Sequence, residues 1–351
     1  MSTDPARDVG PAGARRAALR LAFGVTACFG LVEARGWDAT FLAPLLTAQM
    51  LVKLRQPPTL RQGVGLLVAI ALSTGLVLAV TASFIGHPAV LILALALLLY
   101  LSFYAHRRAA PDLVTLLIQI AAVSLPVLAV AAPDAATGFA ATLFCAGTVA
   151  LLTVWLAFAI FPGGGPESGA PPPMGASAPP DAARGALLNT LVLLPVLTGF
   201  ILVATELAVV VLIVIVTLLR QHDPETGRRA ALGLILGNLI GGVAAAVAYD
   251  LILMNDTLPF FVLVCLAATL MFAGRIAGAG ARAPVHAIAL ATFILLLGLG
   301  MSPLPGGSGE AFAARLVNVL MASAYAIGAV SLLGSRRGGS LRLTPGRTRA
   351  P

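Results

Sequence analysis

Charged residues are scarce in this chain of 351 residues. Asp, Glu, Lys and Arg together make up 10% of it, whereas soluble domains carry about 25%. Aromatic residues reach only 6%, which argues against recognition through large aromatic surfaces. The mean hydropathy is +0.99. This composition excludes an ordinary soluble domain and predicts an integral membrane protein.

The residue patterns that many enzymes need are also missing. The chain has no GxxxxGK[ST] nucleotide loop, no GxSxG nucleophile motif and no HExxH zinc motif. Its four histidines lie in different segments, and its three cysteines lie inside separate apolar runs without a CxxC pair. We therefore expect no enzyme activity, no catalytic residues, no metal site and no cofactor.

About a dozen apolar runs fill most of the sequence. A helix needs roughly 20 residues to cross a bilayer core about 30 Å thick, and several runs reach that length. The alternation of apolar and polar residues typical of membrane β-barrels is absent. An all-α membrane protein with about twelve transmembrane helices is therefore predicted. The runs are residues 17–34, 39–53, 63–85, 88–105, 113–132, 137–161, 186–204, 207–219, 229–249, 258–274, 284–301 and 312–334.

Basic residues occupy alternate gaps between these runs. Twenty of the 22 precede the first run, follow an even-numbered run or lie in the C-terminal tail, and only Arg35 and Arg315 break the pattern. Lys and Arg near helix ends are retained on the cytoplasmic side during insertion. The alternation therefore predicts twelve crossings with both termini in the cytoplasm. It also accounts for the pI of 10.4 without a nucleic-acid partner.

The composition of the basic residues points to a bacterial source. All but one of them are arginine, and Lys53 is the single lysine. This bias is typical of a GC-rich bacterial gene. We therefore expect a multi-pass protein of the bacterial inner membrane.

The chain divides into two similar halves. Residues 163–184 are rich in Gly, Pro, Ala and Ser and are typical of a flexible linker. Leu-Arg-Gln recurs at 54–56 and 219–221, and a Phe-Ala-Ala motif recurs at 139–141 and 312–314. Six runs on each side of the linker predict two parallel six-helix repeats. The expected parts are a disordered cytoplasmic N-terminus (1–14), a first repeat (15–161), a cytoplasmic linker (162–185), a second repeat (186–334) and a basic tail (335–351).

Two short runs hold matching positions in the halves. The runs 39–53 and 207–219 are each the second of their half and are short for a full crossing. Short or broken segments at matching places indicate a binding site near the bilayer midplane. Hydrophobic mismatch or tight helical hairpins are the alternative explanation.

Polar residues inside or beside the apolar runs mark a candidate substrate path. A charge at the bilayer centre costs about 2.5–3.5 kcal/mol on insertion scales, so it usually faces protein or water and has a partner. Solvated loop charges and hydrogen bonds between helices are the alternatives. We expect Glu206 and Asp250 as proton-coupling candidates and Arg315 as the group that holds a carboxylate. The candidate path consists of Arg315, Glu206, Gln49, Asn238 and Asn318.

Small residues spaced four apart form two stripes. Gly233, Gly237 and Gly241 lie in one run, and Ala71, Gly75 and Ala79 form a smaller stripe in another. Such spacing lets helices approach closely. Both stripes therefore predict helix packing.

Three stretches of the first half resemble a known family. They read RRAALRLAFG (15–24), GWDATFLAPLLTAQM (36–50) and PPTLRQGVGLL (57–67). The pattern is similar to the FUSC-like superfamily of fusaric-acid-resistance proteins and aromatic carboxylic acid exporters. The resemblance implies proton-dependent export of hydrophobic weak acids, often with a periplasmic membrane-fusion partner of the HlyD type. Larger members carry a sizeable cytoplasmic domain where this chain has only the linker.

The expected function is therefore proton-coupled efflux of small hydrophobic or aromatic carboxylic acids. Its partners would be the lipid bilayer, the acid and an HlyD-type protein, and a homo-oligomer is left open. One alternative is another twelve-helix carrier of the major-facilitator type, although LRQPPTLRQG after the second run lacks the acid of the G-x-x-x-D-R-x-G-R-K motif. A non-transporting membrane scaffold or assembly subunit is another.

The topology can be tested with reporters placed in the linker. A phosphatase fused within residues 163–184 should be inactive and a fluorescent protein there should fluoresce, because the linker is expected in the cytoplasm. An active phosphatase at this position would contradict the topology.

Overall fold

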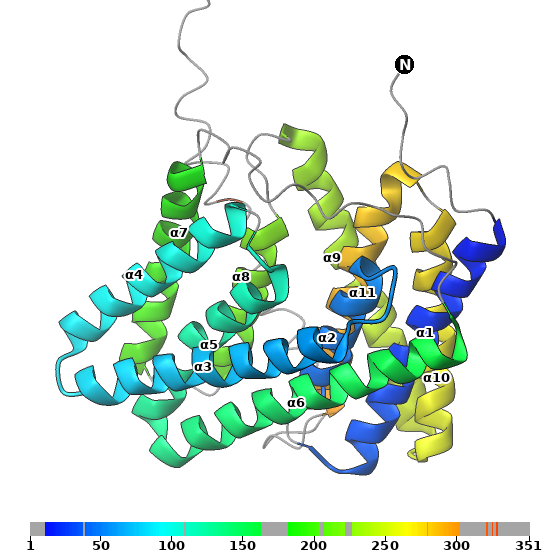
Figure 1. Ribbon diagram of the computed structural model, residues 1–351, viewed down its shortest axis with the longest axis horizontal. Helices are drawn as coiled ribbons and strands as arrows, with labels where there is room; N and C mark the ends of the chain where they lie inside the picture. Colours follow the sequence, from blue (N-terminus) through cyan, green and yellow to red (C-terminus); the bar gives the residue numbers. More distant parts are fainter. Residues whose placement is uncertain are drawn as a thin grey trace, which may run out of the picture.

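The computed structural model describes residues 11–37, 39–108, 110–162, 182–203, 207–221, 227–278 and 280–301, together with Met321, Tyr325 and Gly328. This part of the chain contains eleven α-helices, one short 3₁₀ helix and no strand (Figure 1). The expected all-α class is confirmed. The helices are α1 (Pro11–Ala34), α2 (Leu42–Lys53), α3 (Leu60–Phe84), α4 (Pro88–Arg107), α5 (Asp112–Ala131), α6 (Pro133–Ile160), α7 (Ala182–Val203), α8 (Leu207–Gln221), α9 (Gly227–Met254), α10 (Leu258–Gly278), η2 (Gly280–Arg282) and α11 (Ala283–Met301).

Nine of the described helices are long and apolar enough to cross a membrane. By length and composition the chain is therefore a multi-pass helical membrane protein. The two short runs of the sequence are short helices, of 12 residues in α2 and 15 in α8. The run 312–334 lies outside the described residues except for Met321, Tyr325 and Gly328, which are helical. The total of twelve stays a prediction.

Several helices extend beyond the apolar runs. α1 begins at Pro11, inside the segment expected to be disordered, and α7 begins at Ala182, inside the expected linker. α9 continues to Met254, so Asp250 lies within the helix and not after it. Hydropathy detects only the part of a helix that faces lipid or core, whereas backbone hydrogen bonds continue through the polar ends.

Local signals set several helix starts. Thr59 and Gln62 form a capping box at α3, in which the Thr59 side chain accepts from the Gln62 N–H and the Gln62 side chain accepts from the Thr59 N–H. Proline occupies the first turn of α4 and α6, where its missing N–H has no intrahelical partner to lose. These signals mark where α3, α4 and α6 begin.

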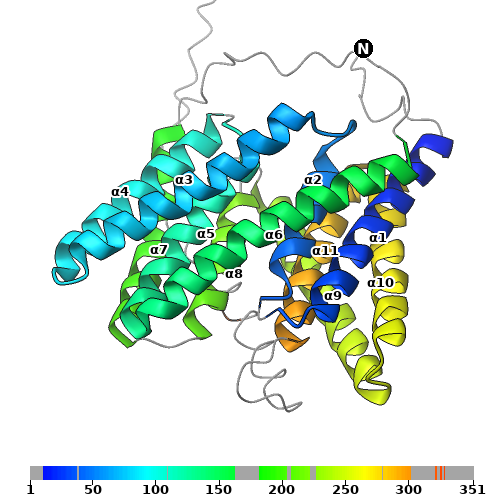
Figure 2. The ribbon, with the colours of Figure 1, turned by 60° about the horizontal axis from the view of Figure 1, so that its bottom comes forward.

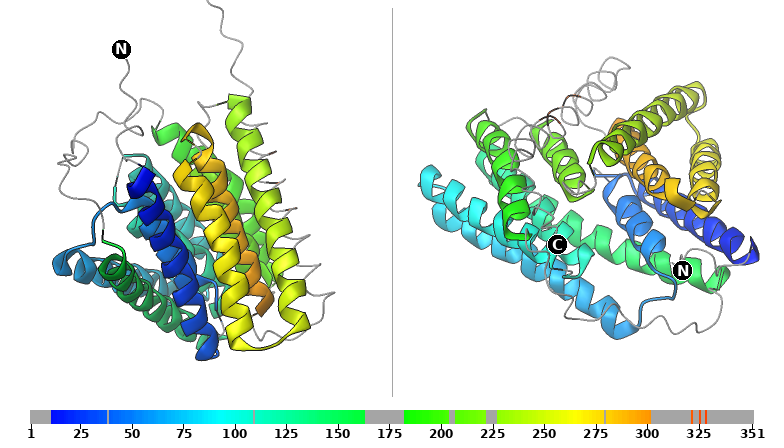
Figure 3. Two further views of the ribbon diagram at one scale, coloured as in Figure 1. Left: turned by 90° about the vertical axis from the view of Figure 1, so that its right-hand side faces the viewer. Right: turned by 90° about the horizontal axis from the view of Figure 1, so that it is seen from above.

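Helices from opposite sides of residues 163–181 pack against each other. α1 lies along α10, and α4 lies against α7. In Figure 3, left, α1 and α10 run side by side. Between them the Thr26 and Thr269 hydroxyls are 3.0 Å apart, and the Phe29 and Phe261 rings meet edge to face. The two halves are therefore interleaved, and neither completes its own core.

Other contacts join helices within each half. α3 packs on α5 and α6, and α9 packs on α11. Figure 2 shows α3, α4 and α6 crossing one side of the molecule, with α9, α10 and α11 at the other. Trp155 of α6 donates a 2.8 Å hydrogen bond to the Pro58 carbonyl just before α3. Its indole thereby fixes the entry of α3.

The glycine stripe of α9 packs as predicted. A Cβ at Gly237 would lie 2.9 Å from the Val285 carbonyl oxygen of α11, and one at Gly241 would overlap the Ala289 carbonyl oxygen. The stripe Ala71–Gly75–Ala79 packs against no helix among the described residues. All three residues are exposed on α3, and a Cβ at Gly75 would meet no described residue within 4 Å. The prediction for α3 is wrong because this helix turns its Ile70–Val77 face inward instead.

Gly241→Val should destabilise the protein. Its side chain would collide with the α11 backbone, and overpacking of this kind costs about 1–3 kcal/mol. The measurement is thermal unfolding of the detergent-solubilised protein. Gly75→Val is the matched control, because it makes the same change at an exposed helical position. Equal shifts in melting temperature for the two variants would contradict the packing.

Candidate functional site

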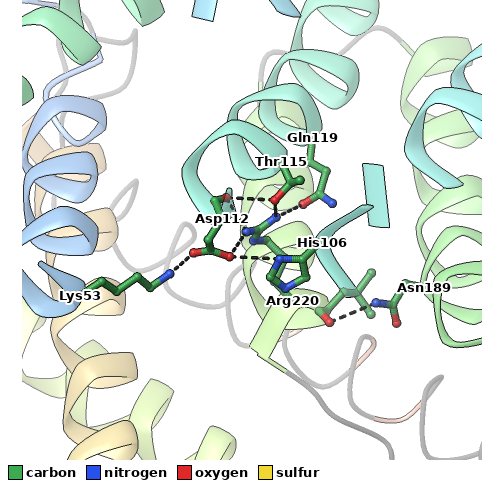
Figure 4. Close-up of polar contacts among 8 residues, drawn as sticks. Lys53, His106, Asp112, Thr115, Gln119, Asn189 and Arg220 are labelled. Carbon is green, nitrogen blue, oxygen red and sulfur yellow. Dashed lines mark hydrogen bonds and ion pairs between the residues drawn. The ribbon is translucent and has the colours of Figure 1, made fainter. Parts of the chain in front are cut away.

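One helix start and three helix ends meet at one place in the bundle. α5 begins there with Asp112 in its first turn. The last turns of α2, α4 and α8 bring Lys53, His106 and Arg220. Acids are favoured at helix N-termini and cations at C-termini because of the helix dipole. The sequence thus places each charge where its own helix favours it, and the bundle brings the four together (Figure 4).

Arg220 is the buried centre of this group. Its side chain is 6% exposed. Nη1 donates to the Thr115 hydroxyl at 3.1 Å and to Gln119 Oε1 at 2.7 Å. Nη2 donates to the main-chain carbonyl of Asp112 at 2.7 Å and to its carboxylate. A guanidinium is charged at all physiological pH values and offers five donors, so its burial here depends on these α5 acceptors.

The Asp112 carboxylate meets two cations and an imidazole. Lys53 Nζ and Arg220 Nη2 both donate to it. His106 Nδ1 lies 3.1 Å from Asp112 Oδ1, without the alignment of a hydrogen bond. Two cations thus share a single acid. This cluster of Lys53, His106, Asp112 and Arg220, which we call the Asp112 cluster, carries an excess of positive charge.

Polar side chains behind the cluster complete its surroundings. Asn189 of α7 donates a 3.2 Å hydrogen bond to the Leu219 carbonyl, next to Arg220 in the last turn of α8. Gln119 is fully buried, and its amide nitrogen has no hydrogen-bond partner in the part of the chain that the structure describes. Leaving a buried donor unsatisfied costs about 1–3 kcal/mol. The amide next to the guanidinium therefore lacks an acceptor.

The residues predicted for the substrate path are not brought together in the described part of the chain. Gln49 is half-buried on α2. Asn238 is buried on α9, where its Oδ1 accepts from the Thr292 hydroxyl of α11 at 2.6 Å, the interhelical role given as its alternative. Asp250 is exposed three turns further along α9. Glu206, Arg315 and Asn318 lie outside the described residues.

Sequence reasoning missed the Asp112 cluster. Lys53 and Arg220 belong to the basic residues from which the topology was predicted, and Asp112 was not singled out. A signal was present, because Asp112, Thr115 and Gln119 are spaced three and four apart at the start of an apolar run. That spacing places three polar groups on one helix face. Their partner on α8 could not be read from the sequence.

Comparison with known proteins finds one family model that resembles the first six helices. Residues 17–157 match a family model described as Protein of unknown function (DUF2955). The matched stretch begins inside α1 and ends inside α6, and it contains Lys53, His106 and Asp112 but not Arg220. No curated protein matches the chain. No solved structure matches it either. The DUF2955 description assigns no activity to the matched helices.

Arg220→Met should destabilise the protein strongly. The Thr115 hydroxyl, Gln119 Oε1 and the Asp112 carbonyl would lose their donor, and a buried polar group left unsatisfied costs about 1–3 kcal/mol. Arg55→Met is the matched control: Arg55 occupies the same place in the recurring Leu-Arg-Gln motif but is exposed, and surface changes stay within about 0.5 kcal/mol. Thermal unfolding in detergent measures both. Similar melting temperatures for the two variants would show that Arg220 does not stabilise the bundle.

Proposed function

We propose that this chain is a membrane transporter of small hydrophobic or aromatic carboxylic acids and that the Asp112 cluster binds their carboxylate. The observation that carries the proposal is the buried Arg220 guanidinium, held by α5 and joined by Lys53 around one acid. Arginine is the residue that recognises carboxylates through paired hydrogen bonds. Two cations at the end of an apolar bundle suit a ligand with an anionic head and an apolar body.

The helix contacts support the two-repeat architecture. Moving six helices along the chain turns α1–α2 into α7–α8 and α3–α5 into α9–α11. If the two repeats are related by a twofold axis, a move of six helices takes α4 to α10 and takes α7 back to α1. The contact α4–α7 then corresponds to α10–α1, which is observed. In the same way α5–α8 corresponds to α11–α2. Figure 3, right, gives the view from above in which these pairs can be followed.

Burial repeats with the same period. Five buried positions of α4 recur 170 residues later in α10, and five of α1 recur 168 residues later in α7. These spacings lie close to that of the Leu-Arg-Gln motif and fit two parallel repeats of six helices. The pairs are Leu91–Phe261, Leu95–Cys265, Leu99–Thr269, Ser102–Phe272 and Phe103–Ala273, and Ala18–Ala186, Leu21–Asn189, Ala22–Thr190, Val25–Leu193 and Phe29–Leu197.

The two short helices connect this architecture to the site. α2 and α8 hold equivalent places, and their lengths correspond to about 18 Å and about 22 Å of helix, less than a bilayer core of about 30 Å. Each ends in a cation, Lys53 or Arg220, that reaches Asp112. A relative movement of the two halves would change the distance between these cations. Alternating access, in which one repeat rocks against the other, would therefore act directly on the site.

The arginine alternation supports a bacterial inner-membrane location with both termini in the cytoplasm. In that topology α5 starts on the cytoplasmic side, so the Asp112 cluster faces the compartment from which an exported acid would enter. The resemblance to FUSC-like exporters supports outward, proton-coupled transport and an HlyD-type partner. Glu206 and Asp250 remain the proposed coupling residues, and Arg315, Gln49, Asn238 and Asn318 the proposed path beyond the cluster.

Transport of radiolabelled benzoate in energised cells tests the proposal. Expression of the wild type should lower benzoate accumulation, and Lys53→Met should abolish this effect because the carboxylate loses a partly exposed cation. Arg55→Met, with normal efflux expected, is the control for a lost positive charge at the same end. Arg315→Ala and Glu206→Gln should also remove efflux while leaving membrane insertion intact.

The variants are compared at equal amounts of protein in the membrane, and each result other than the expected one has a defined meaning. Full efflux by Lys53→Met would exclude the Asp112 cluster as the anion site. Uptake of benzoate instead of efflux would favour another kind of twelve-helix carrier. Wild type that moves no acid in either direction would favour a membrane scaffold or assembly subunit.

A further inference from the structure

We infer that Asp112 is a resident ligand of the cluster and that a carboxylate from solution takes its place on Arg220 and Lys53. The internal acid would then keep the site closed until an anion of the same chemistry displaces it. The identity of that anion as a transported acid rests on the proposed function. The exchange itself is a binding property that does not depend on transport.

Exposure decides which partner can leave. The Asp112 side chain is 31% exposed and Lys53 is 47% exposed, whereas Arg220 is 6% exposed. A carboxylate at the protein surface can turn into water and be solvated there. A guanidinium buried between α5 and α8 cannot do so without losing its hydrogen bonds. Asp112 is therefore the movable partner and Arg220 the fixed one.

Arg220 stays anchored when the Asp112 carboxylate leaves. Three of its hydrogen bonds go to groups that the exchange does not move: the Thr115 hydroxyl, Gln119 Oε1 and the main-chain carbonyl of Asp112. The guanidinium is thus held in place before a ligand arrives, which reduces the ordering cost of binding. Only the Nη2 bond to the carboxylate has to be replaced.

Gln119 supplies a second observation that points to a ligand. Its amide nitrogen is buried without an acceptor among the described residues, while its Oε1 accepts from Arg220. Buried polar groups in proteins are almost always hydrogen-bonded, so each exception calls for an explanation. Asp112 already fills the one carboxylate position next to the guanidinium. An oxygen atom of an incoming ligand, or of a water that enters with it, would satisfy the amide.

The exchange conserves charge at the site. One carboxylate leaves the two cations and another arrives, so Lys53 and Arg220 never face each other without an anion between them. No proton has to be gained or lost. The ligand class follows from this balance: a small monocarboxylate fits, whereas a neutral amide or an ammonium compound does not.

Chemical rescue of Asp112→Ala tests the inference. Removing the side chain leaves the two cations without their anion and leaves space for a small one. The variant should melt at a lower temperature than the wild type in detergent, and millimolar formate or acetate should restore most of the loss. Sodium chloride or acetamide at equal concentration should not. The double variant Asp112→Ala/Arg220→Lys should lose the rescue, because the three donors of lysine cannot keep the three hydrogen bonds to α5 and hold the carboxylate as well.

Asp112→Asn gives a second readout that keeps the side-chain volume. Its benzoate affinity, measured by calorimetry, should exceed that of the wild type by about tenfold, because the internal competitor is gone and the binding-competent fraction rises. Arg55→Met should bind benzoate like the wild type.

Three results would overturn the inference. The first is an Asp112→Asn affinity equal to or below that of the wild type. The second is rescue of Asp112→Ala by chloride as well as by formate, and the third is rescue by inorganic phosphate but by no carboxylate, which would indicate a site for phosphate groups such as those of lipids. Rescue and tight binding without any transport would leave the exchange standing and remove the proposed function. Transport without rescue would leave the proposed function standing and remove the exchange.

Discussion

A guanidinium inside an apolar helix bundle must find its hydrogen bonds within the protein, and much of the described structure around Arg220 follows from this requirement. The acceptors come from one helix, α5, as a carboxylate, a hydroxyl, an amide oxygen and a carbonyl. Because Asp112 also binds Lys53, the same contact ties α2 to α5. One buried cation thereby fixes the relative positions of three helices at one end of the bundle.

The polar contacts elsewhere in the described bundle are of a weaker kind. Thr26 meets Thr269, Thr292 meets Asn238, and most other hydroxyls donate to a carbonyl of their own helix. Hydrogen bonds between membrane helices average about 0.6 kcal/mol, so such contacts align helices without locking them. Close packing does the rest, as at Gly237 and Gly241 against α11. The charged end and the neutral remainder therefore hold the helices together by different means.

The sequence predicted more of the fold than of the site. Apolar runs located all eleven described helices, including the short α2 and α8, because hydropathy and helix length are local properties. Which face of a helix packs inward was harder to predict, as the exposed Gly75 shows. Glycine spacing does not say which helix lies next to it. Arg220 was read as a topology charge because its exposure depends on α5, a helix about a hundred residues away in sequence. Gln119 and Asn189 hydrogen-bond between helices, the alternative role expected from the sequence for polar residues inside apolar runs.

The interleaving of α1 with α10 and of α4 with α7 has a consequence for how such a chain could arise. Six helices alone would leave one flank of the first and one flank of the fourth bare of protein. A second copy of the same unit would cover both flanks at once, because the fourth helix of each copy would pack against the first helix of the other. Joining the two copies by a tether would alter no contact, and afterwards each copy would be free to diverge. In the proposed two-repeat architecture the acid at the start of α5 would be such a divergence, because α11 begins with Ala283 where α5 begins with Asp112.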